Sequence, residues 1–154
     1  MKRLWIYQSS RFLTDDDVEV VKQTLAEFVA QWTAHGNQLA GRFEIRHQLF
    51  ILLMVDEEKA MVTGCSIDKS VHLLKKIEQT LGISLFDRLQ IAYRKDVDEP
   101  IQVASQDDFR KLLADGEINP DVAVVFNNMI TTVEELDTKW EVPMKDSWHA
   151  KVFL

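Results

Sequence analysis

The chain has 154 residues, of which 46% are hydrophobic and 28% are charged, and its formal net charge is −7. This length and composition are those of one soluble globular domain, and the negative charge argues against a general nucleic-acid or membrane-surface binder. No apolar run approaches the roughly 18 residues of a membrane span. The single cysteine excludes an internal disulfide. We therefore expect a cytoplasmic, single-domain protein over residues 1–154.

The first 93 residues alternate strand and helix patterns. Aromatic and β-branched runs predict strands, and apolar residues at helical spacing predict helices. Thr14 and Asp17 predict an acidic capping box at the start of the first helix. The expected elements are a strand at 4–8, a helix from 15 to about 34, strands at 43–46 and 50–55, a short strand before Gly64, a helix to Leu81 and a strand at 85–93.

This order, β-α-β-β-α-β, is that of a ferredoxin-like unit. The six consecutive apolar residues at 50–55 predict a strand that is interior in its sheet and buried on both faces. A ferredoxin-like unit leaves one sheet face bare. We therefore expect residues 101–154 to form a C-terminal α-β-α extension that covers it. The predicted fold is α+β, an α/β sandwich with a mixed sheet.

The C-terminal extension has its own start and stop signals. Residues 101–103 predict a short edge strand, Ser105 and Asp108 predict a second acidic capping box, and Gly116 ends the helix that follows. Residues 121–126 predict a strand, and a last short helix is expected to end near Trp140. The tail from 141 to 154 has no clear period and is expected to be irregular.

The most informative stretch is residues 61–81, where a Gly, the only cysteine and a serine precede a helix. Ser66 is the expected N-cap and Gly82 the expected C-cap. Cys65, Asp68 and His72 fall within about 60° of one another, roughly opposite the apolar stripe. The apolar stripe consists of Ile67, Val71, Leu74, Ile77 and Leu81.

The start of this helix suits a small anion or a protein partner. Backbone N–H groups at a helix N-terminus attract negative charge. Residues 59–95 carry seven Lys or Arg against three acids, or +4, so the remainder carries −11. The structural alternative is an ordinary capped helix with a solvated basic face. The candidate ligand-binding residues are Gly64, Ser66, Lys69, Ser70 and Arg88.

A second hypothesis uses Cys65 as a nucleophile with His72 and Asp68, in a small thiol-dependent enzyme. A thiol at a helix N-terminus near an imidazole can be activated in this way. The alternative is an inert small cysteine beside an exposed histidine. Adding His47 or His149 gives no paired ligand spacing, so we expect no metal and no cofactor. The four tryptophans, at positions 5, 32, 140 and 148, are expected in the core, with a ligand pocket as the alternative.

Two stretches imitate a nucleotide-binding ATPase. Residues 36–43 have the G-x-x-x-x-G of a phosphate loop, and residues 50–57 end in the paired acids of a Walker B strand. A phosphate loop also needs Lys, then Ser or Thr, between a strand and a helix. Here Arg42 and Phe43 stand in those places, and the predicted order is helix, loop, strand. The Walker A motif is therefore absent.

Seven segments spread over essentially the whole chain carry a resemblance to known sequences, and the most specific of them is Gly64–His72. The segments are Trp5–Gln8, Gln31–Gly36, Val55–Asp56, Gly64–His72, Val125–Asn128, Trp140–Pro143 and Ser147–His149. Together they resemble a family of small bacterial proteins of uncharacterised activity, whose members often carry the label "ABC transporter ATPase". The label implies an ATPase, but no LSGGQ signature occurs.

We expect that the purified protein neither binds nor hydrolyses ATP at physiological Mg²⁺, because Arg42 and Phe43 occupy the positions of the phosphate-binding Lys and the Mg²⁺-binding hydroxyl. Calorimetric titration with Mg-ATP measures this directly. A dissociation constant in the micromolar range would contradict the expectation.

Overall fold

The computed structural model describes all residues from 1 to 154 and divides into two compact units. The first unit contains Met1–Phe86 and Thr131–Val133, and the second contains Asp87–Ile130 and Glu134–Leu154. Both contain helices and antiparallel sheets, so the predicted α+β class is confirmed. None of the helices has the length and apolar character that a membrane crossing requires.

The first unit is built on a three-stranded antiparallel sheet in the order β1-β5-β4, formed by Lys2–Gln8, Phe50–Asp56 and Ala40–Arg46. The central strand is β5, as its apolar run predicts. Its residues from 50 to 55 are at most 1% exposed. Because side chains alternate along a strand, Ile51, Leu53 and Val55 face one side and Phe50, Leu52 and Met54 the other. The strand is therefore buried on both faces.

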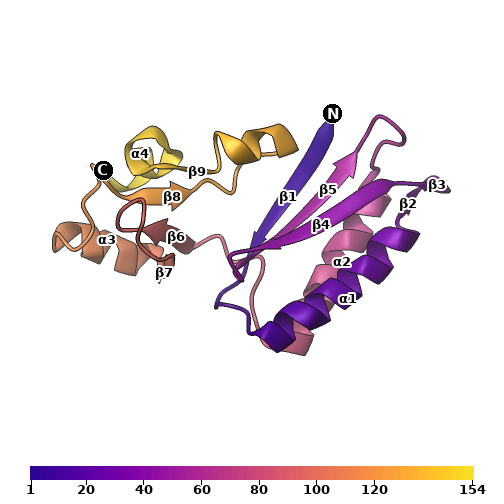
Figure 1. Ribbon diagram of the computed structural model, residues 1–154, viewed down its shortest axis with the longest axis horizontal. Helices are drawn as coiled ribbons and strands as arrows, with labels where there is room; N and C mark the ends of the chain where they lie inside the picture. Colours follow the sequence, from indigo (N-terminus) through magenta and orange to yellow (C-terminus); the bar gives the residue numbers. More distant parts are fainter. The chain divides into compact units, whose positions relative to one another are not determined.

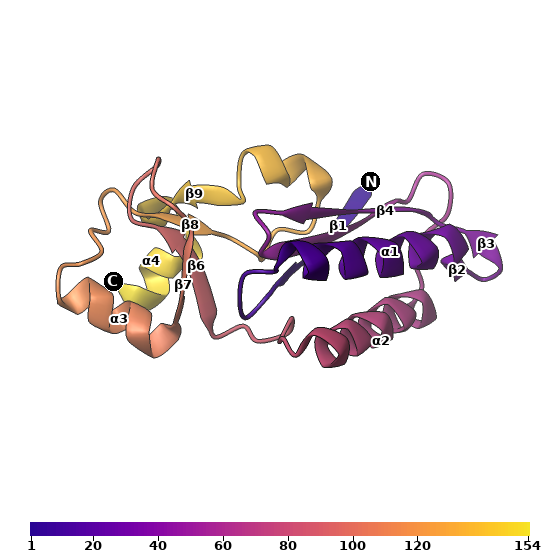
Figure 2. The same ribbon diagram turned by 60° about the horizontal axis from the view of Figure 1, so that its bottom comes forward.

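Helices α1 (Asp15–Gln31) and α2 (Gly64–Leu81) lie against the same face of this sheet (Figures 1 and 2). Val21 and Leu25 of α1 and Leu74 and Ile77 of α2 are buried there with the side chains of β5. The predicted capping box of α1 is confirmed, because Thr14 and Asp17 each bond the other's backbone N–H at 3.0 Å. The hydrogen bond from Arg11, followed by that from the Thr14 backbone, lowers the pKa of Asp17.

Helix α1 ends earlier than predicted. Trp32 leaves the helical conformation at φ −77° and ψ 120°. The next residues, Thr33–Ala34 (β2), pair with Asn37–Gln38 (β3) across a tight turn in which His35 has a φ of 51° and Gly36 a φ of 77°. Residues 37–38 are therefore β3, and β4 begins at Ala40, three residues before the strand expected at 43–46. A second tight turn, at His47 and Gln48, joins β4 to β5.

The predicted ferredoxin-like arrangement is not confirmed, because its fourth strand belongs to another sheet. The strand expected at 85–93 is β6 (Gln90–Arg94), and it pairs with β7 and β8 of the second unit. Before it, the Asp87 carboxylate accepts the Leu89 N–H at 2.9 Å and forms a turn. All strand pairs are antiparallel, so the expected mixed sheet is not found. Residues 60–63, expected as a short strand, are extended chain without a partner strand.

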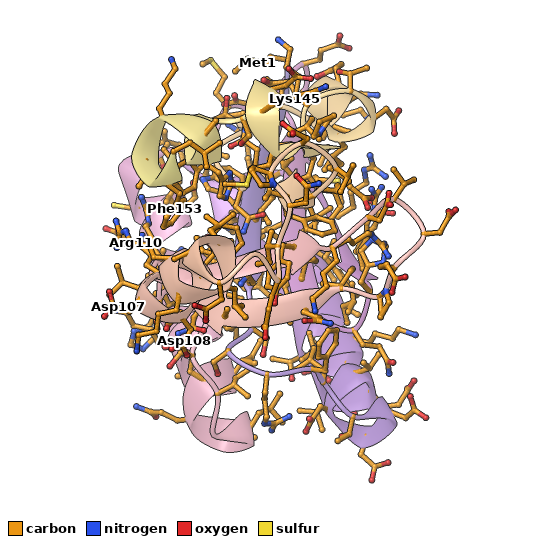
Figure 3. All side chains as sticks on the ribbon, turned by 90° about the vertical axis from the view of Figure 1, so that its left-hand side faces the viewer. Met1, Asp107, Asp108, Arg110, Lys145 and Phe153 are labelled. Atoms are coloured by element: carbon orange, nitrogen blue, oxygen red, sulfur yellow. The ribbon has the colours of Figure 1, made fainter.

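The second unit has a four-stranded antiparallel sheet in the order β7-β6-β8-β9, which adds Gln102–Ser105, Val124–Phe126 and Glu141–Pro143 to β6. Helix α3 (Gln106–Ala114) begins at the predicted Ser105 cap. Its Phe109 packs with Tyr93 of β6 and Phe153 of α4 (Trp148–Phe153) at centroid distances of 5.3 and 5.0 Å. Figure 3 shows Arg110 between Asp107, at 3.7 Å, and the Phe153 ring, at 5.0 Å.

The sequence predicts an irregular C-terminal tail, but the tail is regular. It contains β9, a short 3-10 helix at Met144–Asp146 (η2) and α4. Met144, Trp148 and Phe153 anchor it in the core of the second unit. The last short helix expected before Trp140 is a 3-10 helix at Val133–Asp137 (η1).

Trp32 is the contact point between α1, β4 and α2. Its side chain is 1% exposed, and its indole N–H donates to the Ser66 carbonyl at 2.8 Å. A Cβ atom added at Gly41 would meet the indole ring at 3.0 Å, which is closer than carbon atoms normally approach. A side chain at position 41 would therefore require the indole to shift.

Gly41→Ala should lower the free energy of unfolding by about 1–2 kcal/mol, because the new methyl group overpacks a fully buried indole. Chemical unfolding followed by tryptophan fluorescence gives this value. Gly64→Ala is the matched control, since nothing lies within 4 Å of a Cβ atom there and alanine is the better helix former. Equal losses in the two variants would contradict the proposed contact.

Candidate functional site

The predicted site lies at the start of α2. The helix begins at Gly64, two residues before Ser66, which the sequence predicts as its N-cap. Thr63, not Ser66, is the N-cap: its hydroxyl accepts the Ser66 N–H at 3.2 Å. The Ser66 hydroxyl accepts the Thr63 N–H at 2.8 Å, which completes a capping box. Gly82 is the C-cap, with a φ of 64°, as predicted. The helix therefore includes Gly64 and Cys65 in its first turn.

Two of the predicted ligand-binding hydroxyls face the core. Ser66 and Ser70 are 1% and 3% exposed. The Ser66 hydroxyl also donates to the Thr63 carbonyl at 2.8 Å, and the Ser70 hydroxyl donates to the Ile67 carbonyl at 2.6 Å. In the first turns of α2 the buried face therefore includes the two serines. Ile67 and Val71, which the predicted apolar stripe contains, are only half-buried. Both hydroxyl groups thus donate to backbone carbonyls of the same segment, not to a ligand.

The remaining predicted residues of the first two turns are exposed. Cys65, Asp68 and His72 lie on the outer face, as their spacing predicts. No hydrogen bond or ion pair joins them to one another. The thiol therefore has no hydrogen-bonded base in this arrangement. Lys69 is exposed beside them and forms no ion pair.

The backbone at the start of α2 offers two donors. The N–H groups of Gly64 and Cys65 have no acceptor within the protein. The Thr63 hydroxyl accepts the Ser66 N–H instead, and the Thr63 carbonyl accepts the Ile67 N–H. Nothing lies within 4 Å of the Cβ position of Gly64, so the space in front of it is open. The first turn of α2 thus offers two N–H groups, and Lys69 is exposed four residues after Cys65 on the same helix. Arg88, the second predicted cation, is exposed and belongs to the second unit.

The ATPase-like stretches have structural roles of their own. Residues 36–43 form a turn, β3 and the first half of β4, which is not the strand-loop-helix of a phosphate loop. Asp56 accepts the Glu58 N–H at 3.1 Å, and Glu57 accepts the Val62 N–H at 3.1 Å and lies 3.8 Å from Arg3. The paired acids therefore order the turn after β5.

Ser147 and His149 form a buried pair in the second unit, and the sequence patterns predict no specific role for it. His149 is 1% exposed, its Nδ1 lies 2.7 Å from the Ser147 hydroxyl, and its ring stacks on Trp148 at 3.8 Å. Burial lowers the pKa of His149 to about 4. The imidazole is therefore neutral at pH 7 and serves as a packed core group. Its only signal in the sequence is its position between aromatic residues in the tail.

Comparison with known proteins adds no relative. No family model, no curated protein and no solved structure matches the chain. Within the protein, no three His, Cys, Asp or Glu side chains form a group that could hold a metal ion. The candidate site rests on the geometry of α2 alone.

His149 should make the stability depend on pH. Its pKa is about 4 in the folded state against 6.5 for the ordinary group, so the unfolded chain binds the proton more readily. The stabilisation is present above pH 6.5 and is lost as the pH falls toward 4, by up to about 3 kcal/mol. Urea unfolding at several pH values measures this loss.

His149→Asn should flatten the pH dependence between these values, since asparagine keeps a polar atom near Ser147 and does not titrate. His72→Asn is the control, because His72 is exposed on α2. If His149→Asn kept the full slope, the titrating group would lie elsewhere.

Proposed function

We propose that the protein is a non-catalytic cytoplasmic binding protein that contacts a small anion or an acidic segment of a partner at the first turn of α2. The observation that supports it best is the pair of N–H groups of Gly64 and Cys65. They are exposed and have no acceptor, and the cation Lys69 is exposed four residues after Cys65 on the same helix. Such groups at a helix start bind phosphate and carboxylate oxygens.

The charged residues of α2 determine how strongly an anion is expected to bind at its first turn. Lys69, Lys75 and Lys76 are exposed along the helix, whereas Asp68 is the acid nearest its start. The helix dipole alone favours an anion by roughly 0.3–1 kcal/mol at an exposed site, and Asp68 opposes it. Useful affinity therefore requires a side-chain cation as well, and we propose Lys69 for this role.

The exposed side chains also favour binding over catalysis. A nucleophilic thiol needs a base within hydrogen-bond reach and a group that orients the base. Cys65 and His72 share the outer face without a hydrogen bond between them, and no residue orients the imidazole. An exposed row of separate polar groups suits contact with a ligand better than transfer of protons.

Titration with phosphate or sulfate, followed by backbone amide NMR shifts, tests the proposal. Shifts should gather at residues 64–70 and weaken in Lys69→Ala, because the cation is lost while the N–H groups remain. Lys76→Ala is the matched control, two helical turns farther along the same face. Shifts elsewhere, or none, would leave this helix start with a structural role.

A second function, a thiol-dependent enzyme, is favoured by one observation: Cys65 is exposed in the first turn of a helix. Helix N-termini are a recognised setting for reactive cysteines. Rapid labelling of Cys65 at about pH 6, where an ordinary thiol with a pKa of about 8.5 is protonated, would support this function. Slow labelling, matching that of a small-molecule thiol, would exclude it.

A further inference from the structure

The outer edge of β4 has no partner. Strand β4 is the last strand of the sheet β1-β5-β4, and it pairs with β5 without interruption from Ala40 to Arg46. No backbone hydrogen bond reaches the other side of residues 40–45. By contrast, the outer edge of β1 is met by Thr132, which bridges Arg3, and by the Thr131 carbonyl, which accepts the Leu4 N–H at 2.9 Å.

Edge strands of this kind are normally protected. Short length, a proline, a bulge or charged side chains keep them from pairing with other chains. Strand β4 has seven residues, no proline and a continuous register with its neighbour, and of these devices it carries only charged side chains, at Arg42, Glu44 and Arg46. The edge can therefore accept another strand whose charges are complementary to its own.

The charges of β4 are complementary to those of a second copy of the same strand. In an antiparallel pair centred on Phe43, Arg42 lies opposite the partner's Glu44, and Glu44 lies opposite the partner's Arg42. The twofold symmetry therefore gives two pairs of opposite charge from one sequence. Arg42 is exposed and has no ion pair within the chain, so it is available for such a contact.

Other alignments are less favourable. Centring the antiparallel pair on Ile45 would set Glu44 opposite the partner's Arg46, but it would pair only residues 44–46 of each strand, whereas the pair centred on Phe43 uses all seven residues. Glu44 also lies 3.5 Å from Arg46 within its own strand. Centring the pair on Glu44 places the two Glu44 side chains opposite each other. A parallel pair in register places each charge opposite its own copy. Like charges directly opposite one another destabilise a sheet. On the helix-covered face, the chosen alignment also sets Phe43 opposite its copy, and aromatic cross-strand pairs are favourable.

We propose that two copies of this chain associate through antiparallel pairing of their β4 edges, with Phe43 on the twofold axis and Arg42 of each copy opposite Glu44 of the other. The product is a continuous sheet with three strands from each copy. This contact is separate from the start of α2, and so it does not depend on the binding function proposed above.

Charge reversal tests both the contact and its register. In Arg42→Glu every cross-strand pair joins two acids, and in Glu44→Arg every pair joins two arginines. Each variant alone should weaken self-association at least tenfold, measured by sedimentation over a concentration series. An equimolar mixture of the two variants should form a heterodimer, because each strand then faces opposite charges. The double variant Arg42→Glu/Glu44→Arg should recover self-association.

Lys22→Glu, on the exposed face of α1, is the control for change in net charge and should associate like the unchanged protein. Circular dichroism confirms that each variant is folded, and heterodimer formation shows the same for both single variants at once. A monomer at all concentrations would overturn the proposal. So would association that neither single reversal weakens, because the chains would then meet elsewhere.

Discussion

The buried indole of Trp32 is the contact on which the first unit depends. Trp32 is the residue at which α1 ends, and its ring lies next to Gly41 of β4. Its indole N–H donates to the Ser66 carbonyl in the first turn of α2. Trp5 and Phe28 complete its surroundings, at centroid distances of 6.2 and 5.0 Å. One side chain thus fixes two helices and a strand relative to one another. A buried N–H without a partner is unfavourable, so the bond also selects this position of α2.

The same contact explains which side of α2 is exposed. Ser66 and Ser70 turn inward because the carbonyl of Ser66 meets the indole, and both hydroxyls find acceptors within the first two turns. Small polar residues are tolerated at a core position when their hydrogen bonds are satisfied. The cysteine, the acid, the lysine and the histidine that follow at helical spacing are consequently left in solvent. The exposed face of the site is a consequence of the packing on its buried face.

The sequence predicts local structure well where one residue type has one physical role. The central strand at 50–55, the cap at Thr14 and the stop at Gly82 follow from burial, hydrogen bonding and a positive φ. It predicts poorly where two similar residues compete. Thr63 and Ser66 are both good caps, and the structure uses both in one capping box, with Thr63 as the N-cap. The outward face of Cys65, Asp68 and His72 was predictable, whereas the inward turn of Ser66 and Ser70 was not.

The sequence also failed to predict which distant strands pair, and the reason applies to proteins in general. The order β-α-β-β-α-β is compatible with one four-stranded sheet, but β6 pairs with β7 and β8, which follow it in the sequence. The pair of β6 and β7, joined by residues 95–101, closes less chain than a return to β1 would. The turn at Asp87 and the bond from Leu85 to Glu78 end the first unit before β6 begins. Local sequence patterns do not indicate which of the two sheets β6 joins.

The two proposed surfaces share this scaffold but differ in chemistry. Gly41 of β4 and Ser66 of α2 both touch Trp32, so loosening the indole would disturb the edge strand and the helix start together. Arg42 and Lys69, in contrast, are exposed and lie outside that contact. Changes at these cations alter one surface without moving the indole. Coupling between the surfaces would require an element with two arrangements, and a fully packed tryptophan with a satisfied N–H has only one. We therefore expect ligand binding at α2 and pairing at β4 to be additive.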